Sequence, residues 1–440
     1  MTAAFGARGN KLYGRLGDVY NYLMRTTWRC PKSLDNLFGH QLSGVLAIII
    51  VITLAILAAA CNRPAGKPSN YHIGIATMGY GQSEDESRGA EALIAQYGSV
   101  DNGGMVKHIL FPDNFIEEQE TVIASIAAFA DDPLMKAVIV NQGVPGSAAA
   151  FRKIRDAGRN DIILLIHMPQ DDPVVIAEVA DVIVNANDLW RGYYDIVRAK
   201  DLGAKTFVHM SFPRHMSIET LSRRRDLYEE VCKDLGLQFV SVTVPDPASE
   251  VGIAGAKKAV YDMLPNLIGQ YGKDAVYFTT NTALHEPIIK RVFELGGIFL
   301  CQDDMSPNCG YPGALGLDLS AQMGDWWAMT QAIEKVVVEG GGGGRMGTWA
   351  YSFLYCGTTG LFELARNMIE GKGSGNIQND VLAAFEAITP GCEWLPEVFN
   401  DFNGNTLRDY YLLTMEPYIF GKGFTKVLNE PIPAKYYSIK

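Results

Sequence analysis

Two adjacent aspartates, Asp303 and Asp304, directly follow the apolar run at 298–302 in the stretch IFLCQDDMSPN. Carboxylates at such a place can close a turn, hold a metal ion, act as a nucleophile or accept hydrogen bonds from a polar ligand. Other polar and aromatic side chains follow the other apolar runs of the chain. The candidate ligand-binding residues are Tyr80, Gln82, Asn141, Gln142, His167, Asn187, Asp188, Trp190, Ser211, Arg214, Arg223, Asn281 and Asp303.

This set of side chains suits hydrogen bonding to a small polar molecule, with aromatic faces for stacking. Any one of them alone is typical of a polar loop, and the indication is that they recur at the ends of successive apolar runs. We expect Asp303 to accept hydrogen bonds from ligand hydroxyls or amines, each worth about 1.5–3 kcal/mol. Asp304 is expected to cap or pin the chain beside it, and two solvated turn aspartates are the alternative.

Motifs for cofactor and metal chemistry are missing from the sequence. Gly79 and Gly81 fit the first two positions of a dinucleotide fingerprint, but Glu84 occupies the third. The glycine run at 340–344 lacks the lysine of a phosphate-binding loop, and no histidine or cysteine pair has metal-site spacing. No cofactor and no metal is therefore expected. An α/β enzyme that uses Asp303, His167 or His215 as acid or base stays open as the alternative to a binding protein.

The elements that position these residues follow a repeating pattern. Continuous apolar runs rich in Val, Ile and Phe alternate with longer segments of helical spacing, which is typical of a parallel sheet covered on both faces. Strand–helix–strand units of this length give a doubly wound α/β fold. The predicted strands lie at 71–78, 106–111, 136–141, 162–168, 181–186, 205–211, 238–244, 275–281, 298–302, 314–319 and 348–355.

So many strands exceed one ordinary sheet, and the pattern divides near residue 187. We expect a first lobe at 71–187 and a second at 188–303. Residues 304–372 are expected to return to the first lobe, and 373–440 form a C-terminal extension that the sequence does not place.

The N-terminal region carries a membrane signal. Residues 42–60 hold no charge and are long enough to cross a bilayer. Arg25, Arg29 and Lys32 precede them, which favours a cytoplasmic N-terminal end.

Small residues before Cys61 resemble a bacterial lipoprotein signal, although Ala58 stands where leucine is usual. We expect residues 1–61 to form a signal that ends at a lipidated Cys61, with 62–70 as a linker. An uncleaved membrane anchor is the alternative, and either Met1 or Met24 can be the start. In both cases the later residues lie outside the cytoplasm, tethered to a membrane.

The charge of the chain bears on its partners. A formal net charge of −11 and an isoelectric point near 5.2 argue against a nucleic-acid partner. In an oxidising compartment Cys301 and Cys309 could close a short disulfide loop.

Two stretches resemble a known family. AVYFTTNTALHEPIIKRVFELGGIFLCQDD, ending at Asp304, is similar to the second lobe of type I periplasmic binding proteins and of related sugar-responsive repressors. VIVNANDLWRGYYDIVRAKDLGAKTFVHMS resembles their first crossover. The resemblance implies two Rossmann-like lobes joined by hinge crossovers. It also implies that Asn281 and Asp303 contact the ligand, with Arg223 or Arg214 as the ligand-binding arginine.

The resemblance covers about residues 71–340 and is closest to lipoproteins of the basic-membrane-protein and sugar-binding kind, and to an uncharacterised lipoprotein group distantly related to them. It implies an extracytoplasmic, membrane-anchored solute-binding lipoprotein. Such a protein delivers a small polar organic ligand to an ABC-type transporter or reports it to a sensory partner. The repressors carry an N-terminal helix-turn-helix, whereas this chain carries a membrane signal.

Overall fold

The computed structural model describes residues 69–80, 83–112, 114–401 and 404–439. The expected membrane segment, Cys61 and Gln82 lie outside these residues. Within the described ranges, none of the helices has the length and apolar character needed to cross a membrane.

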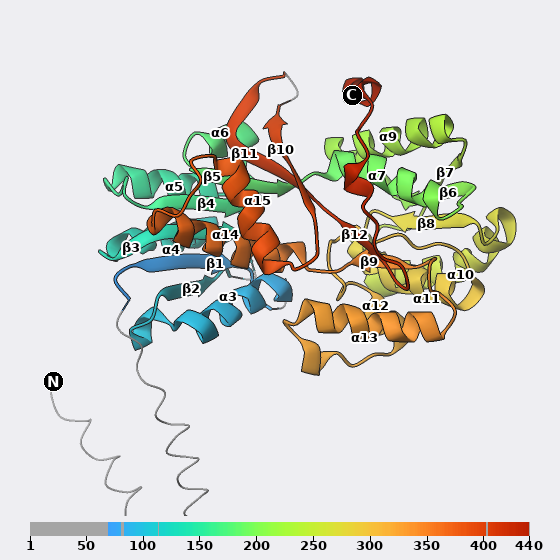
Figure 1. Ribbon diagram of the computed structural model, residues 1–440, viewed down its shortest axis with the longest axis horizontal. Coiled ribbons are helices and arrows are strands. Elements are labelled where there is room, and N and C mark those ends of the chain that lie inside the picture. Colours follow the sequence, from blue (N-terminus) through green and yellow to red (C-terminus); the bar gives the residue numbers. More distant parts are fainter. Residues whose placement is uncertain (1–68, 81–82, 113, 402–403, 440) are drawn as a thin grey trace, which may run out of the picture. The chain divides into compact units, whose positions relative to one another are not determined.

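The first lobe is built on a seven-stranded sheet, shown with its helices in blue, teal and orange in Figure 1. The strand order is β10-β11-β5-β4-β3-β1-β2, and every neighbouring pair is parallel except β10 with β11. The strands are β1 His72–Thr77, β2 Val106–Leu110, β3 Met135–Asn141, β4 Ile163–His167, β5 Val182–Ala186, β10 Trp394–Asn400 and β11 Thr406–Met415.

Helices cover both faces of this sheet, which explains the continuous apolar strands. Ile73 and Ile75 of β1 join the core that contains Ala90 and Leu93 of a covering helix, while Ala76 joins a separate core on the other face. Alternate side chains of one strand thus enter opposite cores. The helices are α3 Glu84–Tyr97, α14 Phe353–Ile369 and α15 Ile377–Ile388 on one face, and α4 Gln119–Ala127, α5 Ser147–Asp156 and α6 Pro173–Ala177 on the other.

The second lobe repeats this plan with a parallel core of order β7-β6-β8. Single bridges from Val276 to Ile298 and from Phe299 to Met346 link it to a short sheet of order β13-β12-β9. The strands are β6 Thr206–Ser211, β7 Gln238–Thr243, β8 Ala275–Thr279, β9 Gly347–Trp349, β12 Pro417–Ile419 and β13 Gly423–Phe424. The helices are α7 Asp188–Asp201, α8 Pro213–Met216, α9 Glu219–Leu235, α10 Gly252–Tyr271, α11 His285–Leu295, α12 Tyr311–Leu315 and α13 Trp326–Glu339.

The chain passes between the lobes three times: from β5 to α7, from β9 to α14, and from β11 to β12. Two doubly wound α/β lobes joined by crossovers confirm the predicted fold, which is of the type I periplasmic binding protein kind.

Some boundaries differ from the sequence-based expectation. The chain re-enters the first lobe at α14, and not at 304, because α12 packs on α11 and Phe299 bridges to Met346 in the second lobe. The expected strand at 314–319 is wrong, since α12 ends at Leu315 and a left-handed Gly316 follows it. The run at 298–302 makes only the two single bridges.

The C-terminal residues take part in both lobes. Helix α15 and strands β10 and β11 complete the first lobe, and the chain then crosses back to β12. The last segment packs on the second lobe, where Tyr436 contacts Tyr193 of α7 and donates to Asp234 of α9.

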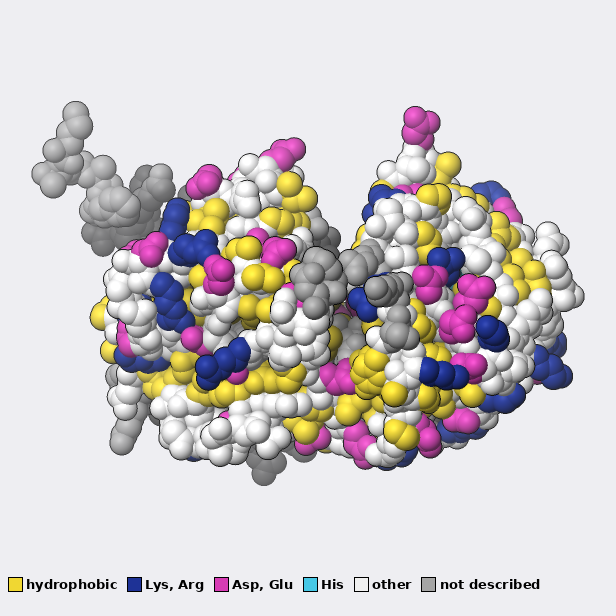
Figure 2. Space-filling view, turned by 90° about the horizontal axis from the view of Figure 1, so that it is seen from above, with side chains coloured by type: hydrophobic (Ala, Val, Ile, Leu, Met, Phe, Trp, Pro, Cys, Tyr) yellow, Lys and Arg dark blue, Asp and Glu magenta, His cyan; other side chains and the backbone are white. Residues whose placement is uncertain are grey.

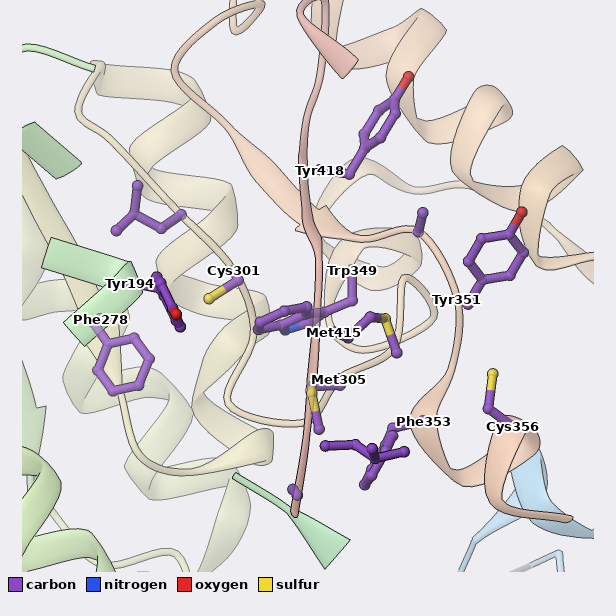
Figure 3. Close-up of a cluster of buried hydrophobic side chains, with 14 of the residues drawn as sticks. Tyr194, Phe278, Cys301, Met305, Trp349, Tyr351, Phe353, Cys356, Met415 and Tyr418 are labelled. Atoms are coloured by element: carbon purple, nitrogen blue, oxygen red, sulfur yellow. The ribbon is translucent and has the colours of Figure 1, made fainter. Parts of the chain in front are cut away.

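A buried aromatic cluster surrounds the crossovers, and Figure 3 shows Trp349 lying among Cys301, Met305 and Met415. The Trp349 indole donates a 2.8 Å hydrogen bond to the carbonyl of Gln302. The guanidinium of Arg191 lies 5.4 Å from the Trp349 ring. Residues of all three crossings therefore share one packed core beneath the site described next.

Candidate functional site

A cavity of about 370 Å³ lies between the two lobes, a volume typical of small-molecule sites. Its walls come from loops and helix starts that follow the carboxyl ends of strands, where open α/β sheets bind ligands. It is lined by Ser83, Glu84, Asp85, Met168, Ala186, Asp188, Arg191, Asp303, Asp304, Met305, Ser306, Asn308, Cys309, Ser352, Phe353 and Leu354.

The first-lobe wall begins at the N-terminus of α3, where Ser83, Glu84 and Asp85 follow β1. At the ends of β3 and β4, Gln142 and Met168 have φ of 47° and 46°, a left-handed backbone that costs free energy in residues other than glycine. Met168 lines the cavity, and Gln142 donates a 3.3 Å hydrogen bond to Ser83. Unfavourable backbone conformations thus occur where the strands meet the cavity.

The second-lobe wall is the loop that follows the run at 298–302. Its first carboxylate, Asp303, is bound by two arginines: Arg224 at 2.5 Å and Arg191 at 3.4 Å. Both guanidinium groups are almost fully buried. Burial alone would raise the pKa of Asp303, but the charges of Arg224 and Arg191 outweigh it and lower that pKa.

Asp188 completes this charge network from the start of α7. Its carboxylate lies 3.1 Å from Arg191 and 3.4 Å from Arg224. Two carboxylates and two guanidinium groups therefore balance one another at the base of the cavity. Breaking such a buried network by removing one partner costs about 3–5 kcal/mol.

Asp304 has a different environment from its neighbour. Its side chain is open to solvent inside the cavity and accepts a 2.9 Å hydrogen bond from Thr282. Its depth between the lobes raises its pKa, and the charges of Asp303 and Asp85 raise it further. Asp304 thus faces the cavity with its charge uncompensated.

Asp85 lies opposite, on α3 of the first lobe. Ser306 of the second lobe donates a 2.8 Å hydrogen bond to its carboxylate. Burial raises the pKa of Asp85, and the neighbouring charge of Glu84 adds to this. The next residue of α3, Glu86, is fully buried, and burial raises its pKa to about 8.

Two of the sequence-predicted residues, Asp188 and Asp303, line the cavity, and both are engaged by arginines. Gln142 does not line the cavity, but it donates a hydrogen bond to Ser83, which does. Beneath the cavity, His167 is fully buried against Phe353, with ring centroids 4.5 Å apart, and burial lowers its pKa to about 3. Asn141 binds His167 and the carbonyl of Leu354.

Three other predicted residues lie outside the cavity lining. Asn187 caps α7 and donates to Glu397, and the Trp190 ring contacts that of Tyr437 in a tilted arrangement, with centroids 4.6 Å apart. Asn281 caps the short turn at 282–284.

Four further candidates also lie away from the cavity lining. Ser211 pairs with Thr280, and Tyr80 is an exposed side chain that contacts Glu91. Arg214 forms a surface ion pair with Asp246, and Arg223 donates to the carbonyl of Ile439.

The cavity also contains residues that the sequence reasoning did not select. Arg191 stands one helical turn after Asp188, a spacing at which a charge pair forms, so it could have been found. Asp85 belongs to an acidic run after the first strand, which is a further readable signal. Ser352 and Phe353 carry no such signal, because only the crossover to α14 brings them to the cavity. Ser306 lies three residues after Asp303 in the same loop, so its place in the sequence was a readable signal.

The cysteines proposed as a disulfide are both free thiols. Cys301 contacts Arg198 at 3.2 Å, and Cys309 contacts His285 at 3.3 Å beside the cavity.

The acidity of the cavity is not an extension of an acidic surface on the face seen in Figure 2. There, Lys and Arg side chains intermix with Asp and Glu over both lobes.

Comparisons with known proteins place this geometry in context. A family model described as "Protein of unknown function (DUF3798)" matches residues 71–347, and a second family model matches 358–439. Two uncharacterised proteins of Treponema pallidum (strain Nichols) are 41% and 33% identical. The first match spans 181 residues, or 41% of this chain and 81% of the relative, and the second spans 211 residues, or 48% and 95%.

A solved structure from Clostridium difficile 630, described as a transcriptional regulator, has the same fold. Its TM-score is 0.71 at 21% identity, over 80% of this chain and 99% of that chain.

Proposed function

The chain belongs to the family described as "Protein of unknown function (DUF3798)", and from this premise we propose that it is a membrane-tethered, extracytoplasmic solute-binding protein. It captures a small polar organic molecule in the cavity between its lobes. The captured molecule is passed to a transporter or reported to a sensory partner.

The observation that carries this proposal is the cavity of about 370 Å³, which both lobes line. A ligand in such a place contacts both lobes at once, so its binding free energy favours the closed arrangement. The lining combines carboxylates, hydroxyls and an amide with Met168, Met305 and Phe353, which suits a molecule with polar groups on a small carbon frame.

The membrane tether rests on the sequence of residues 42–61, with lipidation at Cys61 as the main form and an uncleaved anchor as the other. Tethering suits a binding protein that works beside a membrane partner. It also distinguishes the chain from a DNA-binding regulator of similar fold.

Native mass spectrometry of the full chain, purified gently from membranes in detergent, tests the proposal. We expect a fraction of the protein to carry one small molecule that is released unchanged by denaturation. Conversion of that molecule during incubation would instead support the enzyme alternative, in which Asp303, His167 or His215 acts as acid or base. The low pKa of the buried His167 makes it a poor general acid near neutral pH.

A further inference from the structure

The distribution of charge in the cavity bears on the chemistry of its ligand, and the inference below rests on the proposed binding function. Five carboxylates line the cavity, on Glu84, Asp85, Asp188, Asp303 and Asp304. Arg191 is the one Lys or Arg residue among the lining residues.

Three of the five carboxylates have cationic partners within the protein. Asp188 and Asp303 share Arg191 and Arg224 behind the cavity wall. Glu84 pairs with Arg88 at 2.9 Å, one turn along α3.

Asp85 and Asp304 form no ion pair within the part of the chain that the structure describes. Their hydrogen-bond partners are neutral groups: the side chains of Ser306, Ser352 and Asn308 for Asp85, and the hydroxyl of Thr282 for Asp304. The pKa of each is raised: chiefly by burial for Asp85, and for Asp304 by its depth between the lobes together with the charges of Asp303 and Asp85. One unpaired carboxylate comes from each lobe.

An anionic ligand is not favoured, although three helices begin at the cavity. The N-terminus of α3 already carries Glu84, Asp85 and Glu86. The side chain of Asn187 accepts from an amide at the start of α7, and Ser352 does the same at the start of α14. These ends are therefore occupied by the protein's own acceptors.

Arg191 supplies a second, independent feature. It lines the cavity, it is 2% exposed, and its Nε has no hydrogen-bond partner among the described residues. Its terminal nitrogens lie against Asp188 and Asp303, so its charge is balanced within the protein and is not left for a ligand carboxylate. The hydroxyls of Ser83 and Ser352 and the amide of Asn308 also line the cavity, and groups of this kind can bind a ligand hydroxyl.

We propose that the ligand is a small hydroxylated amine whose ammonium group lies between Asp85 of the first lobe and Asp304 of the second. Each carboxylate then gains a charge-assisted hydrogen bond when the lobes close. The ammonium group also separates two like charges that otherwise repel each other across the cavity. A metal ion fits less well, because the described residues contain no group of three or more acidic, His or Cys side chains with metal-site geometry.

The test compares probes that differ in charge alone, using the full chain in detergent and isothermal titration calorimetry. One series is D-glucosamine, D-glucose and D-glucuronate, and the other is 4-amino-1-butanol, 1,4-butanediol and 4-hydroxybutanoate. In at least one series we expect the amine to bind at least tenfold more tightly than its neutral and anionic analogues. Ca²⁺ and Mg²⁺ are titrated separately.

Asp85→Asn and Asp304→Asn should each reduce the affinity for the amine about tenfold to a hundredfold, because each keeps the shape of the side chain but removes its charge. Asp262→Asn is the matched control, because it removes an exposed carboxylate of α10 that does not line the cavity. This variant should bind the amine as the wild type does. Thermal melts of each variant check that it is folded.

Equal or tighter binding of a neutral or anionic analogue overturns the inference, as does full amine affinity in both asparagine variants. Binding of Ca²⁺ or Mg²⁺ that depends on Asp85 and Asp304, with no amine binding, also overturns it. Failure of all six organic probes overturns the hydroxylated-amine class. A small molecule of another class found by native mass spectrometry would then leave the binding function itself standing.

Discussion

The hydroxyl of Ser306 donates a 2.8 Å hydrogen bond to the carboxylate of Asp85, and this bond joins the second lobe to the first at the cavity wall. A second link lies beside it, where the amide of Phe353 donates to the carbonyl of Met305 at 2.8 Å. One side-chain contact and one backbone contact therefore join the lobes beside the cavity, where a ligand can strengthen or replace the side-chain contact.

Removing the hydroxyl in Ser306→Ala should shift the lobes towards a more open arrangement, because Asp85 loses a donor worth about 1.5–3 kcal/mol. The measurement is the distance distribution between spin labels introduced as unnatural amino acids at Glu120 of α4 and Lys258 of α10. We expect a longer mean distance or a broader distribution. Ser249→Ala, whose hydroxyl bonds only within a surface turn, is the control. Identical distributions in both variants would show that the Ser306 contact does not hold the lobes.

Asp303→Asn should destabilise the protein by about 3–5 kcal/mol, because it leaves Arg191 and Arg224 buried with less compensating charge. The lowered pKa of Asp303 means that its stabilising contribution is present above the unfolded-state pKa and is lost as the pH falls through the lower folded-state pKa. Urea unfolding at neutral pH measures the change in free energy of unfolding. A variant as stable as the wild type would contradict the role given to this network.

Asp304→Asn should have the opposite effect on stability, because the pKa of Asp304 is raised in the folded protein. Replacing a disfavoured charge with a neutral amide of the same shape should leave the melting temperature of the ligand-free protein unchanged or higher at pH 7. Differential scanning calorimetry checks this. A clear fall in melting temperature would indicate that Asp304 pins the chain, as the sequence suggested.

Glu86 predicts a pH dependence of stability around neutrality. Its pKa rises to about 8 on folding, so the folded state binds more protons than the unfolded state above the ordinary carboxyl value. The contribution of Glu86 to stability is therefore full at low pH and declines as the pH rises from about 4.5 to about 8. Glu86→Gln should flatten the profile of unfolding free energy over this range. A profile that keeps the wild-type slope would assign the dependence to another group.

Cys61→Ala tests the proposed tether. Metabolic labelling with a radioactive fatty acid should mark the wild-type chain and leave the variant unlabelled, with a longer precursor in the membrane. Absence of both lipid and cleavage in the wild type would favour the uncleaved anchor at residues 42–60.

Much of the fold could be predicted because strand and helix signals are local. The first eight apolar runs became strands, since each is continuous, rich in Val, Ile and Phe, and followed by a helix. The run at 298–302 makes only single bridges, because Ile298 and Phe299 link two different sheets. The prediction of a strand at 314–319 was wrong, because Gly310 and Gly316, both with positive φ, limit the chain between them to one short helix.

The site was harder to predict, because its contacts join distant parts of the chain. The sequence indicated that Asp303 follows an apolar run. It did not indicate that Arg224 and Arg191 bind this carboxylate. The pair of Arg224 with Asp303 depends on how α9 packs against α7, and no spacing pattern encodes that. Asp85 and Ser306 meet across more than two hundred residues, so their contact appears only once both lobes are assembled.

The distance between the labels at 120 and 258 also tests the central claim most directly. The small molecule recovered from the native protein is returned to the labelled full chain, and the distance is measured as its concentration rises. The account predicts a shorter, narrower distance distribution at saturation and recovery of the molecule unchanged. In Asp304→Asn, the same concentration of the molecule should shorten the distance less. A molecule that binds at saturation while the distance stays the same would contradict capture between the two lobes.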